Sequence, residues 1–215
     1  RAFKAAGTKL VLVDRRPDRL QQIYPDWVDS RDIYMATSVD LADPDLVERA
    51  VKAALERFGQ IDVLANTVGG YRAGTKVHET TLEMWDYLLT LNARTAFVVS
   101  RAVVPAMLER KSGRIIHVSS RAGLQGNARH APQSVSKSAV IRLTESLSAE
   151  LKRSGINVNC ILPGTIDTAQ NRQDMPDAKM DRWVPPEAIA DVFLFLASDA
   201  ARAITGAAIP VYGKA

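Results

Sequence analysis

Ile115-Ile116-His117-Val118-Ser119-Ser120 is an apolar run that ends in two serines, and a glycine-bearing loop separates it from Pro132-Gln133-Ser134-Val135-Ser136-Lys137. The run predicts a buried strand, and the residues from about 132 to 153 predict a helix. Such a strand, loop and helix would bring Ser120 and Lys137 together at the carboxyl end of the strand. Open α/β sheets bind their ligands at that edge, so the stretch predicts a ligand site there.

The rest of the chain alternates short apolar runs with longer helical patterns. This alternation predicts a doubly wound, Rossmann-like parallel sheet in a three-layer α/β/α arrangement. The expected strands are 10–14, 33–39, 61–65, 113–120, 157–162 and 205–213, and the expected helices are 1–6, 43–58, 80–110, 132–153 and 186–198. Pro105 is expected to kink the helix 80–110. The polar, proline-dotted segment at about 166–185 suits a mobile lid over a substrate.

The composition limits the kind of protein. With 215 residues, 47% of them hydrophobic, the chain predicts one domain (1–215) with a substantial core. No apolar run reaches about eighteen residues, so no membrane span is expected. The net charge of +4 is interspersed, and no basic stripe with stacking aromatics argues for a nucleic-acid partner. The lone Cys160 excludes an internal disulfide and fits a reducing, cytoplasmic compartment, where it is expected to be buried packing.

The serine-ended strand and the helix after it resemble the short-chain dehydrogenase/reductase family, in which the strand ends in a catalytic Ser and the next helix carries Tyr-x-x-x-Lys. Ser120 and Lys137 stand seventeen positions apart, as in the family, but Gln133 occupies the tyrosine position, four before the lysine. Asn92, in Leu91-Asn92-Ala93, resembles the family's helix asparagine, which organises a water between the lysine and solvent. The resemblance implies a catalytic group of Asn92, Ser120, Gln133 and Lys137.

Further motifs resemble the family's dinucleotide site. Asp14 ends the expected strand 10–14, where the family's acid accepts hydrogen bonds from the adenosine ribose hydroxyls. Arg15 and Arg16 follow and could instead pair with a ribose phosphate. Because the carboxylate would repel that phosphate, NAD is favoured over NADP. The pair Asp40-Leu41 resembles the family's adenine-contacting site.

Two motifs resemble the family's nicotinamide side. Asn66 to Gly69 matches Asn-Asn-Ala-Gly at its first and last positions, and Pro163 to Thr168 resembles Pro-Gly-x-x-x-Thr. In the second motif a backbone group at Ile166 and the Thr168 hydroxyl would hold the carboxamide. No metal ligand is assigned. The residues that the resemblance implies for cofactor binding are Asp14, Arg15, Asp40, Leu41, Asn66, Val68, Gly69, Lys137, Pro163, Gly164, Ile166 and Thr168.

The family's first strand and its glycine-rich phosphate turn have no counterpart in the 215 residues. A glycine-rich turn lets backbone N–H groups approach a pyrophosphate at a helix start, and it is expected upstream of Leu10. In the family that first strand lies between the strands expected at 10–14 and 61–65. Without it, these two strands would face a gap or close on each other. The chain is therefore expected to be the remainder of something longer.

Gln133 decides what chemistry to expect. In the related enzymes a nicotinamide gives hydride to a carbonyl carbon, and a tyrosine phenol, its pKa lowered by the lysine, protonates the oxygen. An amide can donate a hydrogen bond to a carbonyl but has no proton to release at accessible pH. Losing a positioned acid costs about 10²- to 10⁴-fold, so weak or absent carbonyl reduction is predicted. His130 and Tyr71 are alternative donors, whereas His117 is expected to be structural.

Two functions follow from these observations. The first is a nicotinamide-dependent oxidoreductase that acts on a small-molecule alcohol or ketone. The second is a non-catalytic relative that binds a nucleotide weakly or serves as an oligomer partner. The resemblance also implies a homodimer or homotetramer built on the helices expected at 80–110 and 132–153.

Overall fold

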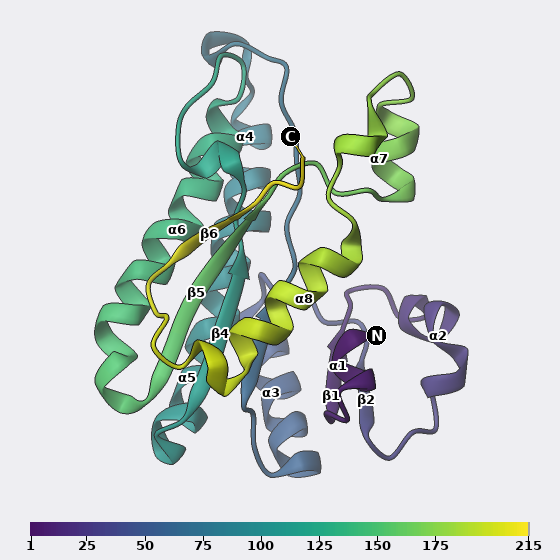
Figure 1. Cartoon of the computed structure of the whole chain (residues 1–215), viewed down its shortest axis with the longest axis vertical. Helices are drawn as coiled ribbons and strands as arrows, with labels where there is room; N and C mark the ends of the chain where they lie inside the picture. The colour runs from purple at the N-terminus through teal and green to yellow at the C-terminus, as the bar shows by residue number, and fades with distance from the viewer. Residues whose placement is uncertain (215) are drawn as a thin grey trace.

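The computed structural model describes residues 1–214 and has the predicted α/β fold with parallel strands (Figure 1). The strands are β1 (Leu10–Val13), β2 (Ile33–Ala36), β3 (Val63–Asn66), β4 (Gly113–Val118), β5 (Ile156–Pro163) and β6 (Ala208–Val211). The helices are α1 (Ala2–Ala5), α2 (Arg19–Ile23), α3 (Pro44–Phe58), α4 (Leu82–Leu88), α5 (Thr95–Arg110), α6 (Ala131–Leu151), α7 (Ala169–Asp174) and α8 (Pro186–Ala197).

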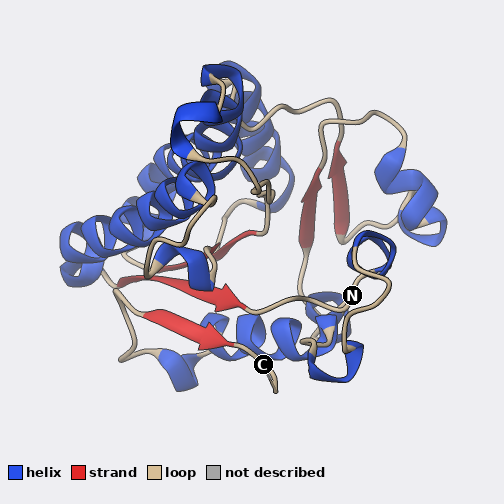
Figure 2. Ribbon diagram, turned by 90° about the horizontal axis from the view of Figure 1, so that it is seen from above, coloured by secondary structure: helices blue, strands red, loops and turns tan. Residues whose placement is uncertain are grey.

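The strands form two sheets that lie apart in Figure 2. One sheet has the order β1-β2 and the other has the order β3-β4-β5-β6, and every strand pair is parallel. Within residues 1–214, β1 pairs with β2 alone and β3 pairs with β4 alone. β1 and β3 therefore do not pair with each other. Of the two arrangements expected for strands 10–14 and 61–65, the structure has the one in which they stay apart.

Helices cover both faces of the four-stranded sheet, as the three-layer prediction requires. Side chains of successive residues point to opposite faces of a strand. Ile115 of β4 accordingly packs in a cluster with Met107 of α5, whereas Ile116 packs with Phe193 of α8. Figure 1 shows α8 crossing one face, with α5 and α6 on the other. A further cluster, which includes Val47 of α3, packs β2 against α3 and α5.

Local sequence explains where α3 begins and ends. The Asp43 carboxylate accepts hydrogen bonds from the N–H groups of Asp45 and Leu46, which satisfies donors that have no partner inside the helix. Pro44 occupies the first helical position, where its missing N–H costs nothing. At the other end Gly59 adopts φ 77°, the left-handed conformation that glycine takes without strain. The helix begins one residue after the predicted start at 43, because Asp43 is its N-cap, and it ends at Phe58 as predicted.

The single helix predicted over 80–110 is wrong in one respect, because a π-helical segment at Leu89–Arg94 separates α4 from α5. A π segment holds one residue more per turn than an α-helix, so it shifts the faces that follow. The apolar pattern does not reveal such an insertion, since both flanking segments keep a helical period. Asn92 lies inside the π segment, and Pro105 lies inside α5.

Some strand boundaries differ from the prediction. β2 ends at Ala36 instead of residue 39, and Ser38 has φ 60°, a left-handed conformation that no strand continues through. β3 begins at Val63, and β6 covers only Ala208–Val211 of the predicted 205–213. No helix of the described residues is both long enough and apolar enough to span a bilayer.

The segment at about 166–185 contains α7 and is tied together at its base. Ile166 and Val184 form an isolated parallel bridge, and the Val184 N–H donates to the Thr165 carbonyl over 2.8 Å. Asp167 forms an ion pair with Arg172, whose guanidinium holds the pKa of that carboxyl below its usual range. Residues of the segment therefore contact one another through backbone hydrogen bonds and an ion pair. That the segment opens as a lid stays a prediction.

Candidate active site at the carboxyl ends of the strands

Lys137 is the buried cation of the site. Its side chain extends from α6, and Nζ donates a hydrogen bond to the Val118 carbonyl over 3.1 Å. Only 5% of the residue is exposed, and this burial lowers the pKa of its ammonium from 10.5 to about 8. A lysine with a depressed pKa beside the end of a strand can bind hydroxyl groups as a donor and still exchange a proton near neutral pH.

The two serines at the end of β4 have different environments. Ser119 Oγ donates to the Lys137 backbone carbonyl over 2.7 Å and so anchors α6 to the strand end. Ser120 Oγ is buried and has no hydrogen-bond partner among the residues that the structure describes. A buried hydroxyl without a partner is costly, which favours a ligand that would satisfy it. The anchoring by Ser119 was not predicted from the sequence, in which only Ser120 was assigned to the site.

Gln133 is buried in the first turn of α6, with 2% of its surface exposed. Its side-chain oxygen, Oε1, accepts a long hydrogen bond of 3.4 Å from the Arg72 N–H. A backbone N–H can only donate, so this contact assigns the amide's oxygen end and leaves its NH₂ end as the donor for another group. The site therefore has a hydrogen-bond donor at position 133, but no group there that releases a proton.

Asn92 connects three parts of the site. Its Oδ1 accepts from the Gly70 N–H over 2.9 Å, while Nδ2 donates to the Gly70 carbonyl and to Ser136 Oγ at 3.2 and 3.0 Å. Both Asn92 and Ser136 are buried. The π segment thereby holds the loop after β3 against α6. Ser136, which was not predicted, directly precedes Lys137 and completes this connection.

Gly69 lies directly against the catalytic candidates. A Cβ atom at this position would lie 2.8 Å from Lys137 Nζ and 2.9 Å from Asn92 Oδ1. Distances under 3.0 Å are too short for a carbon atom, so a side chain here would displace both groups. The glycine is therefore needed for the close packing of three predicted site residues.

Asn66 ends β3 and is fixed by the neighbouring strand. Its Oδ1 accepts from the Val68 N–H, and Nδ2 contacts His117 Nδ1, each over 3.3 Å. His117 Nε2 lies 3.2 Å from Ser100 Oγ on α5. Burial lowers the pKa of His117 to about 4, so the ring is neutral near pH 7. The prediction that His117 is structural is consistent with this buried network.

The motif predicted to hold a carboxamide begins at the last residue of β5. Pro163 pairs with Val211 of β6, and the Gly164 N–H donates to the Val211 carbonyl over 2.9 Å. Thr168 caps α7 by accepting a hydrogen bond from the Asn171 N–H at Oγ1. The Ile166 carbonyl accepts from the Asn171 side chain over 2.7 Å. The Ile166 and Thr168 groups are therefore positioned by Asn171, which the sequence pattern did not indicate.

The acids predicted for the adenosine lie at the ends of the two-stranded sheet. Asp14 follows β1, and its carboxylate accepts from the Arg16 N–H over 2.8 Å and from the Arg19 guanidinium over 3.3 Å. Asp40 Oδ1 accepts from the Ala42 N–H over 2.9 Å. Of the other predicted members, Arg15 is exposed and Leu41 packs against the core beside α3.

Tyr71 and His130 meet at the edge of the site, although 59 positions separate them. The Tyr71 hydroxyl lies 3.0 Å from His130 Nε2, and His130 Nδ1 lies 2.8 Å from the Ala128 carbonyl. The Gly74 N–H also donates to the Arg129 carbonyl over 2.9 Å. The loop after Gly70 is therefore joined to the residues that precede α6.

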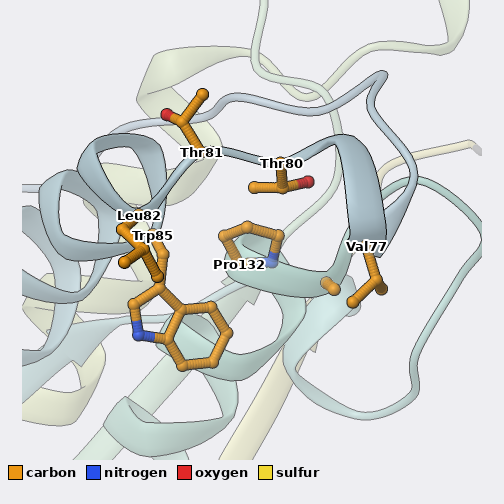
Figure 3. A pocket seen from close by; sticks show the side chains of 7 residues that line it. Val77, Thr80, Thr81, Leu82, Trp85 and Pro132 are labelled. Atoms are coloured by element: carbon orange, nitrogen blue, oxygen red, sulfur yellow. The ribbon is translucent and has the colours of Figure 1, made fainter.

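A cavity of about 180 Å³ lies beside the start of α6 (Figure 3). Its lining is mostly apolar, and the lining residues are Val77, Thr80, Thr81, Leu82, Trp85, Ala131 and Pro132. In the view of Figure 3 the Trp85 ring lies below and to the left of Pro132, and Val77 lies to the right of that proline. Pro132, which lines this cavity, directly precedes Gln133 in the sequence.

The residues at this edge fit the ribose and nicotinamide portion of a dinucleotide. The unpartnered Ser120 hydroxyl and the Lys137 ammonium provide a hydrogen-bond donor and a cation, and Gly69 leaves room for the ammonium at the strand end. The strand ends also lie where open α/β sheets bind such ligands.

Comparison with known proteins identifies the family. Residues 1–213 match the family model described as Enoyl-(Acyl carrier protein) reductase. A 3-oxoacyl-[acyl-carrier-protein] reductase from Synechocystis is 37% identical over 83% of this chain and 74% of its own length. The 2-(R)-hydroxypropyl-CoM dehydrogenase of Xanthobacter autotrophicus is 32% identical over 98% of this chain and 90% of its own length.

A solved structure agrees with these sequence relatives. The crystal structure of gox2181 superposes with a TM-score of 0.89 at 28% identity, covering 98% of this chain and 86% of that one. The family match spans nearly the whole chain, and it includes the strand, loop and helix that carry Ser120 and Lys137. On these grounds the chain belongs to the short-chain dehydrogenase/reductase family.

Proposed function

We propose that this protein is a nicotinamide-dependent oxidoreductase that interconverts an alcohol and a ketone, and that its turnover is slow because Gln133 stands where the family has a tyrosine. The observation that carries the proposal is the packing of Lys137, Asn92 and Gly69 at the end of β4, beside the unpartnered Ser120 hydroxyl. A reduced nicotinamide, when bound, supplies hydride to the carbonyl carbon.

The protein's own residues orient the substrate oxygen. Ser120 Oγ would donate a hydrogen bond to it, and the Gln133 NH₂ group would donate a second. Lys137 Nζ would hold ribose hydroxyls, with Asn92 fixing the loop beside it. These groups bind and polarise a carbonyl, but the amide of Gln133 cannot deliver the proton that the product oxygen needs.

NAD is the cofactor that Asp14 favours. Its carboxylate, held by the Arg16 N–H and by Arg19, would accept hydrogen bonds from ribose hydroxyls and repel a ribose phosphate. The same two arginines could bind a phosphate if the carboxylate were removed, so the preference depends on this one charge.

The relatives and the cavity support a small carbonyl or hydroxyl compound as the substrate. One relative is named as a reductase of an oxoacyl group and another as a dehydrogenase of a hydroxypropyl group. The apolar cavity beside Pro132 would accommodate an apolar substituent of that substrate. We further propose that α5 and α6 mediate self-association as a dimer or tetramer, because Phe97 is 55% exposed and Val135 is 44% exposed.

The test restores the phenol. The protein is assayed with a panel of ketones and alcohols and with NAD(H) and NADP(H), beside Gln133→Tyr and the matched control Gln133→Phe, which has the ring without the hydroxyl. Turnover is expected to rise by about 10²-fold or more in Gln133→Tyr and not in Gln133→Phe. A folded, dinucleotide-binding Gln133→Tyr variant that is no faster than the parent would contradict the proposal.

A second candidate is a protein that binds a nucleotide without turnover. The observation that favours it is again Gln133. Its amide cannot release a proton, and its Oε1 already accepts a hydrogen bond from the Arg72 N–H. Calorimetric binding of NAD to a parent protein that transfers no hydride to any compound of the panel would select this candidate.

A further inference from the structure

We propose that Tyr71, hydrogen-bonded to His130, donates the proton to the substrate oxygen in place of the amide at position 133. The inference rests on the proposed function, because it assigns the proton for that same reaction. It does not follow from the family pattern, in which the donor lies four positions before the lysine.

The hydrogen bonds of His130 determine what Tyr71 can do. The Ala128 carbonyl can only accept, so the 2.8 Å contact with His130 Nδ1 places a proton on that nitrogen. In the neutral ring, Nε2 then accepts the hydrogen of the Tyr71 hydroxyl, 3.0 Å away. In the protonated ring, Nε2 instead donates to the phenol oxygen and stabilises a phenolate. Either state is compatible with the same two contacts.

The loop that carries Tyr71 contacts the candidate active site on both sides of this residue. On one side the Gly70 N–H donates to Asn92 Oδ1 over 2.9 Å, and Gly69 packs against Lys137 Nζ. On the other side the Arg72 N–H donates to Gln133 Oε1 over 3.4 Å. Tyr71 is therefore held between two backbone groups that are bonded to site residues.

His130 is attached to the opposite wall of the same edge. It precedes α6 by one residue, and its carbonyl accepts from the Ser134 N–H over 2.8 Å. The pair thus bridges the loop after β3 and the start of α6, the two segments that meet at Gln133. Tyr71 is 59% exposed, so its side chain is accessible to solvent and is not enclosed by the protein core.

Tyr71 and His130 together account for the proton that is added to the substrate oxygen. Reduction of the carbonyl requires one proton at oxygen besides the hydride at carbon. Reduction begins with the His130 ring protonated, so that Nε2–H donates to the Tyr71 oxygen. The Tyr71 O–H bond then breaks, its proton forms the O–H bond of the alcohol, and the phenolate that remains is held by the same Nε2–H. Imidazolium then returns a proton to the phenolate and regains one from solvent. Alcohol oxidation uses the same steps in reverse.

The first experiment compares Tyr71→Phe in two backgrounds. In the parent, loss of the hydroxyl is expected to lower kcat about 10²-fold, whereas in Gln133→Tyr, where a phenol again stands before Lys137, the same change is expected to matter little. A purely structural role for Tyr71 would cost the same in both backgrounds. Equal losses in the two backgrounds, or no loss in the parent, would overturn the inference.

The second experiment tests whether His130 acts through Tyr71. His130→Gln is expected to slow the parent and to have no further effect once Tyr71 is Phe, because the two residues form one unit. Tyr87→Phe removes the hydroxyl of another half-exposed tyrosine, 45% exposed on α4, and is expected to leave turnover unchanged. Additive losses in the double variant would show that His130 does not act through the phenol.

A structural measurement complements these assays. Crystals of the parent with oxidised dinucleotide and trifluoroethanol, an alcohol that resists oxidation, are expected to place the alcohol oxygen about 2.6–3.2 Å from Tyr71 Oη. An alcohol oxygen beyond hydrogen-bond reach of Tyr71 would overturn the inference alone. A parent protein that transfers no hydride to any compound of the panel would overturn the proposed function, and this inference with it.

Discussion

The side-chain nitrogen of Lys137 donates to the carbonyl oxygen of Val118, 3.1 Å away, from a position that is almost closed to solvent. A single carbonyl replaces only part of the hydration that an ammonium has in water. The lowered pKa of about 8 follows from this deficit, so burial of the Lys137 ammonium destabilises the folded state.

Replacing this lysine by an apolar side chain of similar length is therefore expected to stabilise the protein. The pKa of Lys137 falls from 10.5 in the unfolded chain to about 8 when folded, which corresponds to about 3 kcal/mol. Below pH 8 both states are protonated and the cost is fully present; between about pH 8 and 10.5 the native state has lost its proton, so the cost fades as pH rises. Urea unfolding of Lys137→Met should thus show a gain below pH 8 that shrinks toward pH 10.5, whereas the exposed Lys152→Met should show none. A gain independent of pH would contradict this account.

His117 is expected to set part of the acid sensitivity. Its pKa falls from 6.5 in the unfolded chain to about 4 when folded, so the unfolded state takes up a proton first as the pH drops. Stability is then lost between about pH 6.5 and 4, by about 3 kcal/mol, and the loss levels off below pH 4. His117→Gln should have a shallower slope of unfolding free energy over this window, although it is less stable at pH 7. The exposed His78→Gln serves as the control, and identical slopes in all three proteins would refute the assignment.

Gly69→Ala tests the packing beside the lysine. The added Cβ would approach Lys137 Nζ to 2.8 Å and Asn92 Oδ1 to 2.9 Å, so both groups must shift to make room for it. We expect dinucleotide affinity to fall about tenfold, a loss within the range of about 1–3 kcal/mol that is usual for overpacking. Gly126→Ala is the matched control, because nothing lies within 4 Å of its added Cβ. The measurement is calorimetric titration with NAD, and equal affinities for the two variants would argue against the predicted role of Gly69.

The sequence allowed the layers of the fold to be predicted because each signal was local. The run through Ile115 and Ile116 alternates between two faces, and Asp43 and Gly59 terminate a helix by their own backbone chemistry. The π segment around Asn92 was not predicted, because inserting one residue does not disturb the apolar spacing on either side. Its presence changes where the helix faces point, which only the three-dimensional structure reports.

Part of the candidate site was beyond sequence reasoning for a different reason. The resemblance located Lys137 and Gln133, but the partner of Gln133 is the N–H of Arg72, and a backbone donor is common to every residue except proline. The contact between Tyr71 and His130 joins residues 59 positions apart, and nothing in either segment specifies the distance between them. Neither a contact to a backbone N–H nor a contact between distant segments can be recognised from the residue types alone.

Self-association is expected to depend on the exposed apolar face of α5. Phe97 is 55% exposed on this helix, and a charge there would be buried at a helix–helix interface without a partner. Phe97→Glu is therefore expected to lower the molar mass measured by light scattering after size exclusion, from that of a dimer or tetramer to that of a monomer. Phe195→Glu changes a similarly exposed side chain, 45% exposed on α8, and should leave the mass unchanged. A monomeric parent would contradict this expectation directly.

Asp14 is expected to determine the choice between the two dinucleotides. Its carboxylate is bonded to the Arg16 N–H and to Arg19, so removing it takes away one negative charge and releases a guanidinium that can pair with a phosphate. Asp14→Ala should weaken NAD binding and strengthen NADP binding, shifting the ratio of the two dissociation constants about 10²-fold, which corresponds to about 3 kcal/mol. Asp18→Ala removes the same charge four positions away and should leave the ratio unchanged, because Asp18 makes no side-chain cap contact with α2. If both variants shifted the ratio alike, the preference would reflect net charge near the site instead of a contact made by Asp14.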